Sequence, residues 1–175
     1  PQLCRADGDP HQDKPVDEEQ KRTLQELQSR SEKKVDGIFL QVMALDSARR
    51  GRLEDAVGLS ASRIDLVRQI ADDSPGDTDA EADLAATYEF MGGLLFQQEV
   101  WDEAATNLAR AVGILQMLAV LDPSREDAQR KLGSTLSIQG LAQYHDGDHV
   151  AALGTFIRAV GACRRATQAA PDDKE

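Results

Sequence analysis

Aromatic residues and cysteines are scarce in this 175-residue sequence. Aromatic side chains make up 4% of it, and the two cysteines, Cys4 and Cys163, stand near opposite ends. This usage predicts one unpaired thiol in a tail and one that acts as a small buried hydrophobe. It favours a reducing, cytoplasmic compartment without establishing one.

Basic residues are outnumbered, and long apolar runs are missing. Twenty lysines and arginines face 31 acidic residues, for a net charge of −11. The basic clusters Arg49-Arg50-Arg52 and Arg164-Arg165 are scattered. We therefore expect no nucleic-acid partner. No uninterrupted run approaches the ~20 apolar residues of a spanning helix, and no signal peptide is visible, so we also expect no membrane insertion.

The sequence is in register with itself when it is shifted by 48 residues. Three prolines and a pair of four-residue stretches align under this shift and define two clear copies of a repeat. A third, fainter copy lies further towards the N-terminus. The matching residues are Pro75, Pro123 and Pro171, and Arg110-Ala111-Val112-Gly113 with Arg158-Ala159-Val160-Gly161. The predicted units are about 29–75, 77–123 and 125–171.

Within each unit the apolar residues recur at helical spacing. In the second unit they form two runs, Leu84–Leu95 and Leu108–Leu118, which predict two helices. Gly51 and Gly147 lie between such runs and suit the left-handed conformation that ends a helix. The spacing of Thr78 with Glu81, and of Ser124 with Asp127, predicts N-terminal caps. We expect an all-α fold of helical hairpins, with the prolines in the connections between them.

The units resemble tetratricopeptide repeats. The family pattern has a small residue on the first helix, an Ala twelve residues later, a bulky apolar residue four later and another Ala three later. The second unit has Gly92, Ala104, Leu108 and Ala111 in these places, and the third has Gly140, Ala152, Phe156 and Ala159. The first unit keeps Ala44 and Ala56 but departs from the pattern with Ser60 and Arg63.

This resemblance covers about residues 29–171 and implies a right-handed solenoid of three antiparallel helical hairpins. Its small residues would let paired helices approach closely, and the bulky residue would fill the space between them. A period of 48 residues exceeds the usual 34, so we expect helices of about 22 residues, about 33 Å long. Such long hairpins are similar to repeats attached to bacterial signalling and regulatory proteins.

The two ends of the chain differ from the repeats. Residues 1–16 lack apolar periodicity and are predicted to be a disordered tail or linker before a domain at 17–171, with 172–175 as a second tail. Asp17 and Gln20 could cap a helix that runs from about 18 to 49, which we prefer to a break near Ser29. Its apolar residues follow near-heptad spacing. This spacing predicts packing within the domain or, as the alternative, pairing with a coiled-coil partner.

The last helix is expected to close the array as a cap without a large apolar outer face. In this last helix, small residues replace bulky apolar residues of the second unit. They are Ala162, Cys163, Ala166 and Ala169 in place of Ile114, Leu115, Leu118 and Leu121.

The resemblance places a partner-binding groove on the first helix of each hairpin. Phe96 and Tyr144 are its aromatic anchors, suited to a protein or peptide partner. An alternative is that these two rings only cover the hairpin ends. The groove positions are Ile38, Gln41, Leu45, Ala48, Glu89, Gly93, Phe96, Gln97, Ser137, Leu141, Tyr144 and His145.

Motifs for chemistry are missing. The sequence has no Gly-rich phosphate loop, Cys-x-x-Cys pair or Ser-elbow motif, so we expect a binding scaffold and no enzyme, with no catalytic residues, metal or cofactor. One alternative is a homo-oligomerisation module built on the N-terminal helix or the groove. A second is a metal- or ligand-dependent enzyme at His145 and His149, although these residues more simply form a polar turn with a half-buried histidine.

Overall fold

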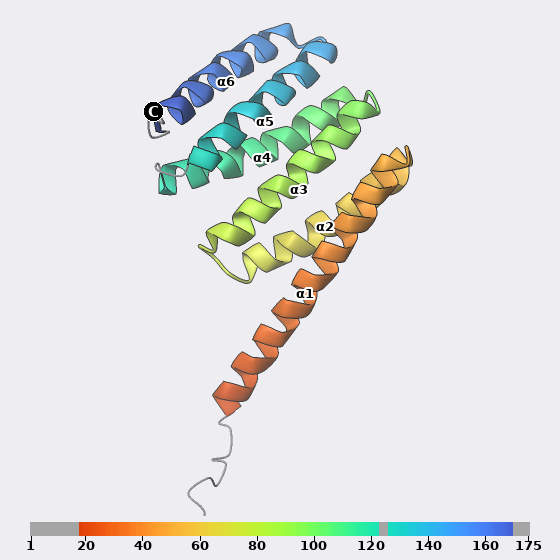
Figure 1. Cartoon of the computed structure of the whole chain (residues 1–175), viewed down its shortest axis with the longest axis vertical. Helices are drawn as coiled ribbons and strands as arrows, with labels where there is room; N and C mark the ends of the chain where they lie inside the picture. The colour runs from red at the N-terminus through yellow and green to blue at the C-terminus, as the bar shows by residue number, and fades with distance from the viewer. Residues whose placement is uncertain (1–17, 123–125, 170–175) are drawn as a thin grey trace, which may run out of the picture.

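The computed structural model describes residues 18–122 and 126–169, which form helices and, within these ranges, no strand (Figure 1). The prediction of an all-α fold is therefore confirmed. The helices are α1 (Glu18–Arg49), α2 (Leu53–Asp72), α3 (Thr78–Gln97), α4 (Trp101–Leu121), α5 (Glu126–His145) and α6 (His149–Ala169).

Each helix packs mainly against its neighbours in the sequence, and α3 also contacts α5. The core consists of two buried clusters, one from α2 to α5 that contains Leu108 and one from α3 to α6 that contains Leu136, and the partly buried Ile114 packs against both. Helix α4 is long and apolar enough to cross a membrane by length and composition alone. Its place between α3 and α5 accounts for that composition, because a central helix buries apolar residues on two sides.

Helix α1 is continuous over 32 residues, which confirms the prediction of one long helix without a break at Ser29. Its proposed cap, Asp17, and the 1–16 segment lie outside the described residues. Arg30 pairs with Asp77, and Lys33 Nζ lies 2.7 Å from Asp73 Oδ2, so two ion pairs hold α1 to the α2–α3 loop. The N-terminal part of α1 projects beyond the other helices (Figure 1).

The turns after α1, α3 and α5 each contain one residue in the left-handed region. Gly51 has φ 75° and Gly147 has φ 92°, as their places in the sequence predict. The third residue is Glu99, with φ 62°, which stands 48 residues from each glycine. The three turns therefore share one backbone conformation, and Glu99 adopts it without the freedom of a glycine.

Glycines allow close contact between paired helices, as expected. A Cβ at Gly92 would lie 2.6 Å from Leu108 Cγ, and one at Gly140 would lie 2.7 Å from Phe156 Cε1. Both separations are too short for real atoms, so the bulky side chain occupies the space that the glycine leaves open. An unpredicted contact of the same kind joins Gly133 to the Cys163 sulfur.

One predicted helix cap is wrong. The N-cap of α3 is Asp77 rather than Thr78, and its carboxylate accepts hydrogen bonds from the amides of Asp79 and Ala80. The Ala80 amide, followed by the Arg30 guanidinium, lowers the pKa of Asp77. Pro75 lies in the connection before this cap, as predicted. Pro123, Pro171 and Ser124 lie outside the described residues.

The departures of the first unit from the repeat pattern have structural roles. Ser60 is buried and donates to the Ala56 carbonyl at 2.7 Å. Arg63 is also buried, and its guanidinium donates to three acceptors. They are the Gly37 carbonyl oxygen at 3.1 Å, the Thr87 hydroxyl and Asp83 Oδ1 at 2.6 Å. Arg63, on α2, thus binds both α1 and α3.

The expectation of a last helix without a large apolar outer face is wrong. Four large apolar side chains of α6 are between 60% and 86% exposed: Val150, Leu153, Ile157 and Val160. The substitutions to small residues fall elsewhere on the helix, where Ala162 and Ala166 pack inward. Cys163, expected to be buried, is exposed.

Candidate functional site

The predicted groove residues divide between exposed and partly buried positions on α1, α3 and α5. Side chains with exposed surfaces are those of Ile38, Gln41, Gln97, Leu141, Tyr144 and His145, whereas Leu45, Ala48, Glu89, Gly93, Phe96 and Ser137 are partly buried. A hydrogen bond from the Thr135 hydroxyl to Glu89 Oε1, at 2.9 Å, joins α5 to α3. The structure therefore brings the α3 and α5 parts of the predicted groove together.

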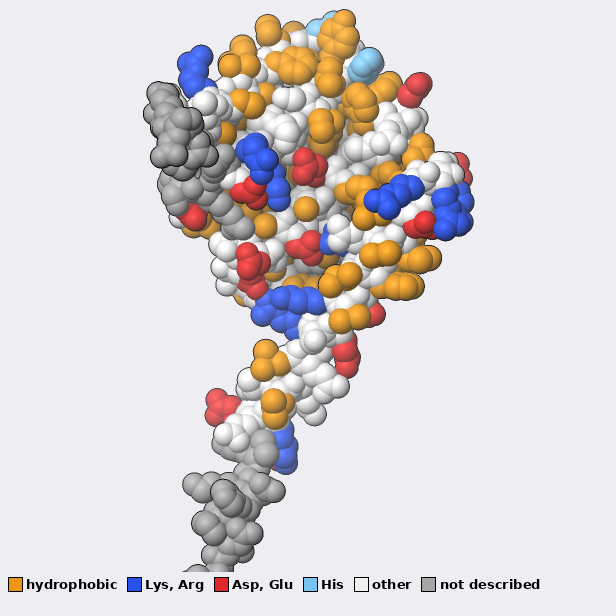
Figure 2. Space-filling view, in the orientation of Figure 1, with side chains coloured by type: hydrophobic (Ala, Val, Ile, Leu, Met, Phe, Trp, Pro, Cys, Tyr) orange, Lys and Arg blue, Asp and Glu red, His pale blue; other side chains and the backbone are white. Residues whose placement is uncertain are grey.

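Five rings gather where α3 and α5 end and where α4 and α6 begin. We call Phe96, Trp101, Tyr144, His145 and His149 the aromatic cluster. The His145 ring stacks on Trp101 with centroids 4.7 Å apart, and Phe96 meets Trp101 edge-on at 4.9 Å. Tyr144 contacts both histidines, at 5.8 Å and 4.9 Å. Figure 2 shows the histidines among hydrophobic side chains at this end of the molecule.

The members of the aromatic cluster differ in burial. Phe96 is partly buried and packs against the main core, so it covers a helix end as the alternative interpretation predicts. Tyr144 is 55% exposed, and Leu141, one turn earlier on α5, is 43% exposed. Tyr144 and Leu141 therefore present exposed apolar surface on α5, and Tyr144 is linked to Trp101 and Phe96 through the His145 ring.

Sequence reasoning did not include Trp101 in the site. Its position in the 48-residue register, level with Leu53 and His149, indicates a packing residue at the start of a helix. The structure instead places it under the His145 ring, between two units. The aromatic cluster contains no residue of α1, so Ile38, Gln41 and Leu45 are not part of it.

The two histidines and neighbouring carboxylates have other contacts. His145 stacks on Trp101, and Asp148 Oδ1 accepts from the Ala151 amide at 2.9 Å at the start of α6. His149 is exposed rather than half-buried. Within the described ranges, no group of three or more His, Cys, Asp or Glu side chains could hold a metal ion.

The surroundings of the aromatic cluster are acidic. Glu99, Asp146 and Asp148 occupy the adjoining turns and are exposed. An apolar surface with a negative edge suits a partner segment that has apolar residues flanked by basic ones.

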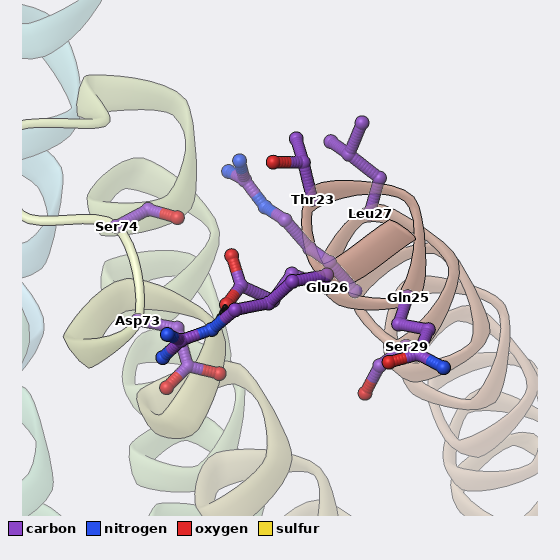
Figure 3. A pocket seen from close by; sticks show the side chains of 9 residues that line it. Thr23, Gln25, Glu26, Leu27, Ser29, Asp73 and Ser74 are labelled. Atoms are coloured by element: carbon purple, nitrogen blue, oxygen red, sulfur yellow. Dashed lines mark hydrogen bonds and ion pairs between the residues drawn. The ribbon is translucent and has the colours of Figure 1, made fainter. Parts of the chain in front are cut away.

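A second hollow lies between the projecting part of α1 and the α2–α3 loop. Figure 3 shows Thr23, Glu26 and Leu27 on α1, opposite Asp73 and Ser74 on the loop. This cleft has a volume of about 720 Å³ and is lined mostly by polar side chains. Its lining includes Arg30, whose ion pair with Asp77 holds the helix to the loop.

Comparison with known proteins gives no relative: no protein-family model matches the chain, and neither does any curated protein. The resemblance to tetratricopeptide repeats therefore rests on the residues of this chain alone.

Proposed function

We propose that this chain is a tetratricopeptide-type module that binds a protein or peptide partner. In this proposal the six helices form a right-handed solenoid of three antiparallel hairpins. The in-register glycine contacts of Gly92 and Gly140 support it, as do the matching turns at Gly51, Glu99 and Gly147. A bacterial signalling or assembly system is the setting that the long hairpins favour.

The observation that carries the proposal is the exposed apolar surface beside the aromatic cluster. Tyr144 and Leu141 project from α5, while Phe96 and Trp101 are held by ring contacts. Rigid aromatic groups lose little conformational entropy on binding, so they are effective anchors for a partner. The acidic turns add a preference for basic residues beside the apolar ones.

The test uses Leu141→Ala combined with Tyr144→Ala. Both side chains are substantially exposed, so the double variant should retain the thermal stability of the wild type. Peptides selected from a random display library on the wild-type protein serve as ligands, and calorimetry measures their affinity. We expect apolar peptides with basic flanks and a loss of at least about tenfold in the double variant.

The control is Val120→Ala, which removes an exposed apolar side chain from α4. It should leave the affinity unchanged. Selected peptides that bind the Leu141→Ala/Tyr144→Ala protein as tightly as the wild type would show that the binding surface lies elsewhere.

A further inference from the structure

Helix α1 carries an apolar stripe on the side that faces away from the protein. The stripe consists of Leu24, Leu27, Val35, Ile38, Phe39 and Val42, each between 57% and 63% exposed. At 3.6 residues per turn these positions fall within roughly 120° of the helix circumference and extend for about 27 Å. The stripe is visible along α1 in Figure 2.

Among residues 18–122 and 126–169, the packing of the helices leaves this stripe exposed. Helix α1 packs against α2 through its opposite face, where Gly37, Ala44 and Ser47 are buried. The larger apolar residues of α1 therefore lie in water while its small ones are covered. A row of exposed apolar side chains of this kind, interrupted here by Ser31 between Leu27 and Val35, is typical of an interaction surface.

We infer that the stripe pairs with the α1 stripe of a second copy of this chain, forming a two-fold helix pair. Its area is sufficient: with the polar residues along its edges, a stripe of this length supplies on the order of 800 Å² per copy, as in a standard interface. Ser31, Val35, Ile38, Val42 and Leu45 follow alternating steps of four and three, the spacing of a helix pair.

Charge also favours a second α1 as the partner. The chain has a net charge of −11, but α1 has six acidic and six basic residues and is neutral. Two copies of α1 can therefore approach without the repulsion that the rest of the protein would impose. Helix α1 packs on α2 through the face opposite the stripe. Its N-terminal part projects beyond the other helices, so space is open for the second helix (Figure 1).

Sedimentation equilibrium of the full chain, from about 1 to 200 µM, tests the inference. We expect a concentration-dependent dimer. Val35→Ser combined with Val42→Ser should raise the dissociation constant at least about a hundredfold, because the symmetric interface loses four valine side chains. Helicity and thermal stability of the diluted, monomeric protein should not change, since both valines are exposed in one copy.

The matched control is Val120→Ser combined with Val150→Ser, which changes two valines on α4 and α6 that are even more exposed than Val35 and Val42. This protein should dimerise as the wild type does. A strict monomer at all concentrations would overturn the inference, and so would a dimer that survives the Val35/Val42 change or is lost in the control. Neither variant alters Leu141 or Tyr144, so the peptide-binding test stands independently of this one.

Discussion

Replacing Arg63 with alanine tests whether a single buried guanidinium holds three helices together. The side chain extends from α2 and donates to the Gly37 carbonyl of α1, and to Thr87 and Asp83 of α3. The equivalent residues of the other units are Ala111 and Ala159. Arg63→Ala therefore restores the repeat pattern and removes every one of these contacts.

The expected loss in the free energy of unfolding depends on whether each acceptor can find another partner or water when Arg63 is removed. Asp83 is 47% exposed, so water can solvate its carboxylate and that ion pair contributes under about 1 kcal/mol. The Thr87 hydroxyl still donates to the Asp83 carbonyl although it loses the Arg63 donor, and the Gly37 carbonyl lies within a helix, so neither buried group loses every partner. The loss therefore comes mainly from the hydrogen bonds to Gly37 and Thr87 and from the packing of the buried side chain. Together they give a loss of about 3 kcal/mol, or about 10 °C in Tm.

Thermal and urea denaturation followed by circular dichroism measure this loss, with Arg158→Ala as the control because Arg158 is exposed on α6. Arg63→Met separates the two contributions, since methionine keeps part of the packing without the donors, and it should lose less than Arg63→Ala. A Tm for Arg63→Ala within about 3 °C of wild type, roughly 1 kcal/mol, would refute the reasoning. It would mean that α1 closes onto α2 when the arginine is replaced by the consensus alanine.

Four further substitutions test the turns, the helix contacts and one buried polar group, each by urea denaturation. Glu99→Gly should stabilise the protein by about 0.5–1 kcal/mol by relieving the left-handed backbone, and a loss would show that the turn is not strained. Gly92→Ala should lower the free energy of unfolding by about 1–3 kcal/mol because the added methyl clashes with Leu108. Gly113→Ala, with no atom within 4 Å of its added Cβ, should raise it by about 0.5–1 kcal/mol. Equal effects of the two substitutions would contradict the close contact at Gly92. Gln139→Met should gain about 1 kcal/mol, because the buried Gln139 carbonyl oxygen has no partner within the described residues; lower stability would indicate a bond to water.

The sequence was informative wherever the repeat compared one unit with another. The resemblance to tetratricopeptide repeats implied that Leu108 and Phe156 fill the space beside Gly92 and Gly140, and the structure shows both contacts. The register also placed Gly51 in a left-handed turn. These features are local to one pair of helices and are repeated, so two copies of a pattern supply independent evidence.

Contacts between units were harder to predict because they join residues that no repeat spacing links. Arg63 looked like a defect in the first unit, since its three acceptors belong to other helices. The stacking of His145 on Trp101 was missed for the same reason. The candidate site could be predicted only in part: Phe96, Leu141, Tyr144 and His145 were identified, but Trp101, which contacts Phe96 and His145, was not.

The orientation of α1 shows why hydrophobic periodicity alone could not identify its buried face. Both faces have apolar or small residues, and a count of hydrophobicity favours the side with Val35, Ile38 and Val42. Close packing against α2 instead selects Gly37 and Ala44, because small residues let two helix backbones approach. Val35, Ile38 and Val42 are then left exposed in the part of the chain that the structure describes. An exposed apolar stripe of this size lowers the solubility of the protein. Contact with another molecule is the function that would explain its presence.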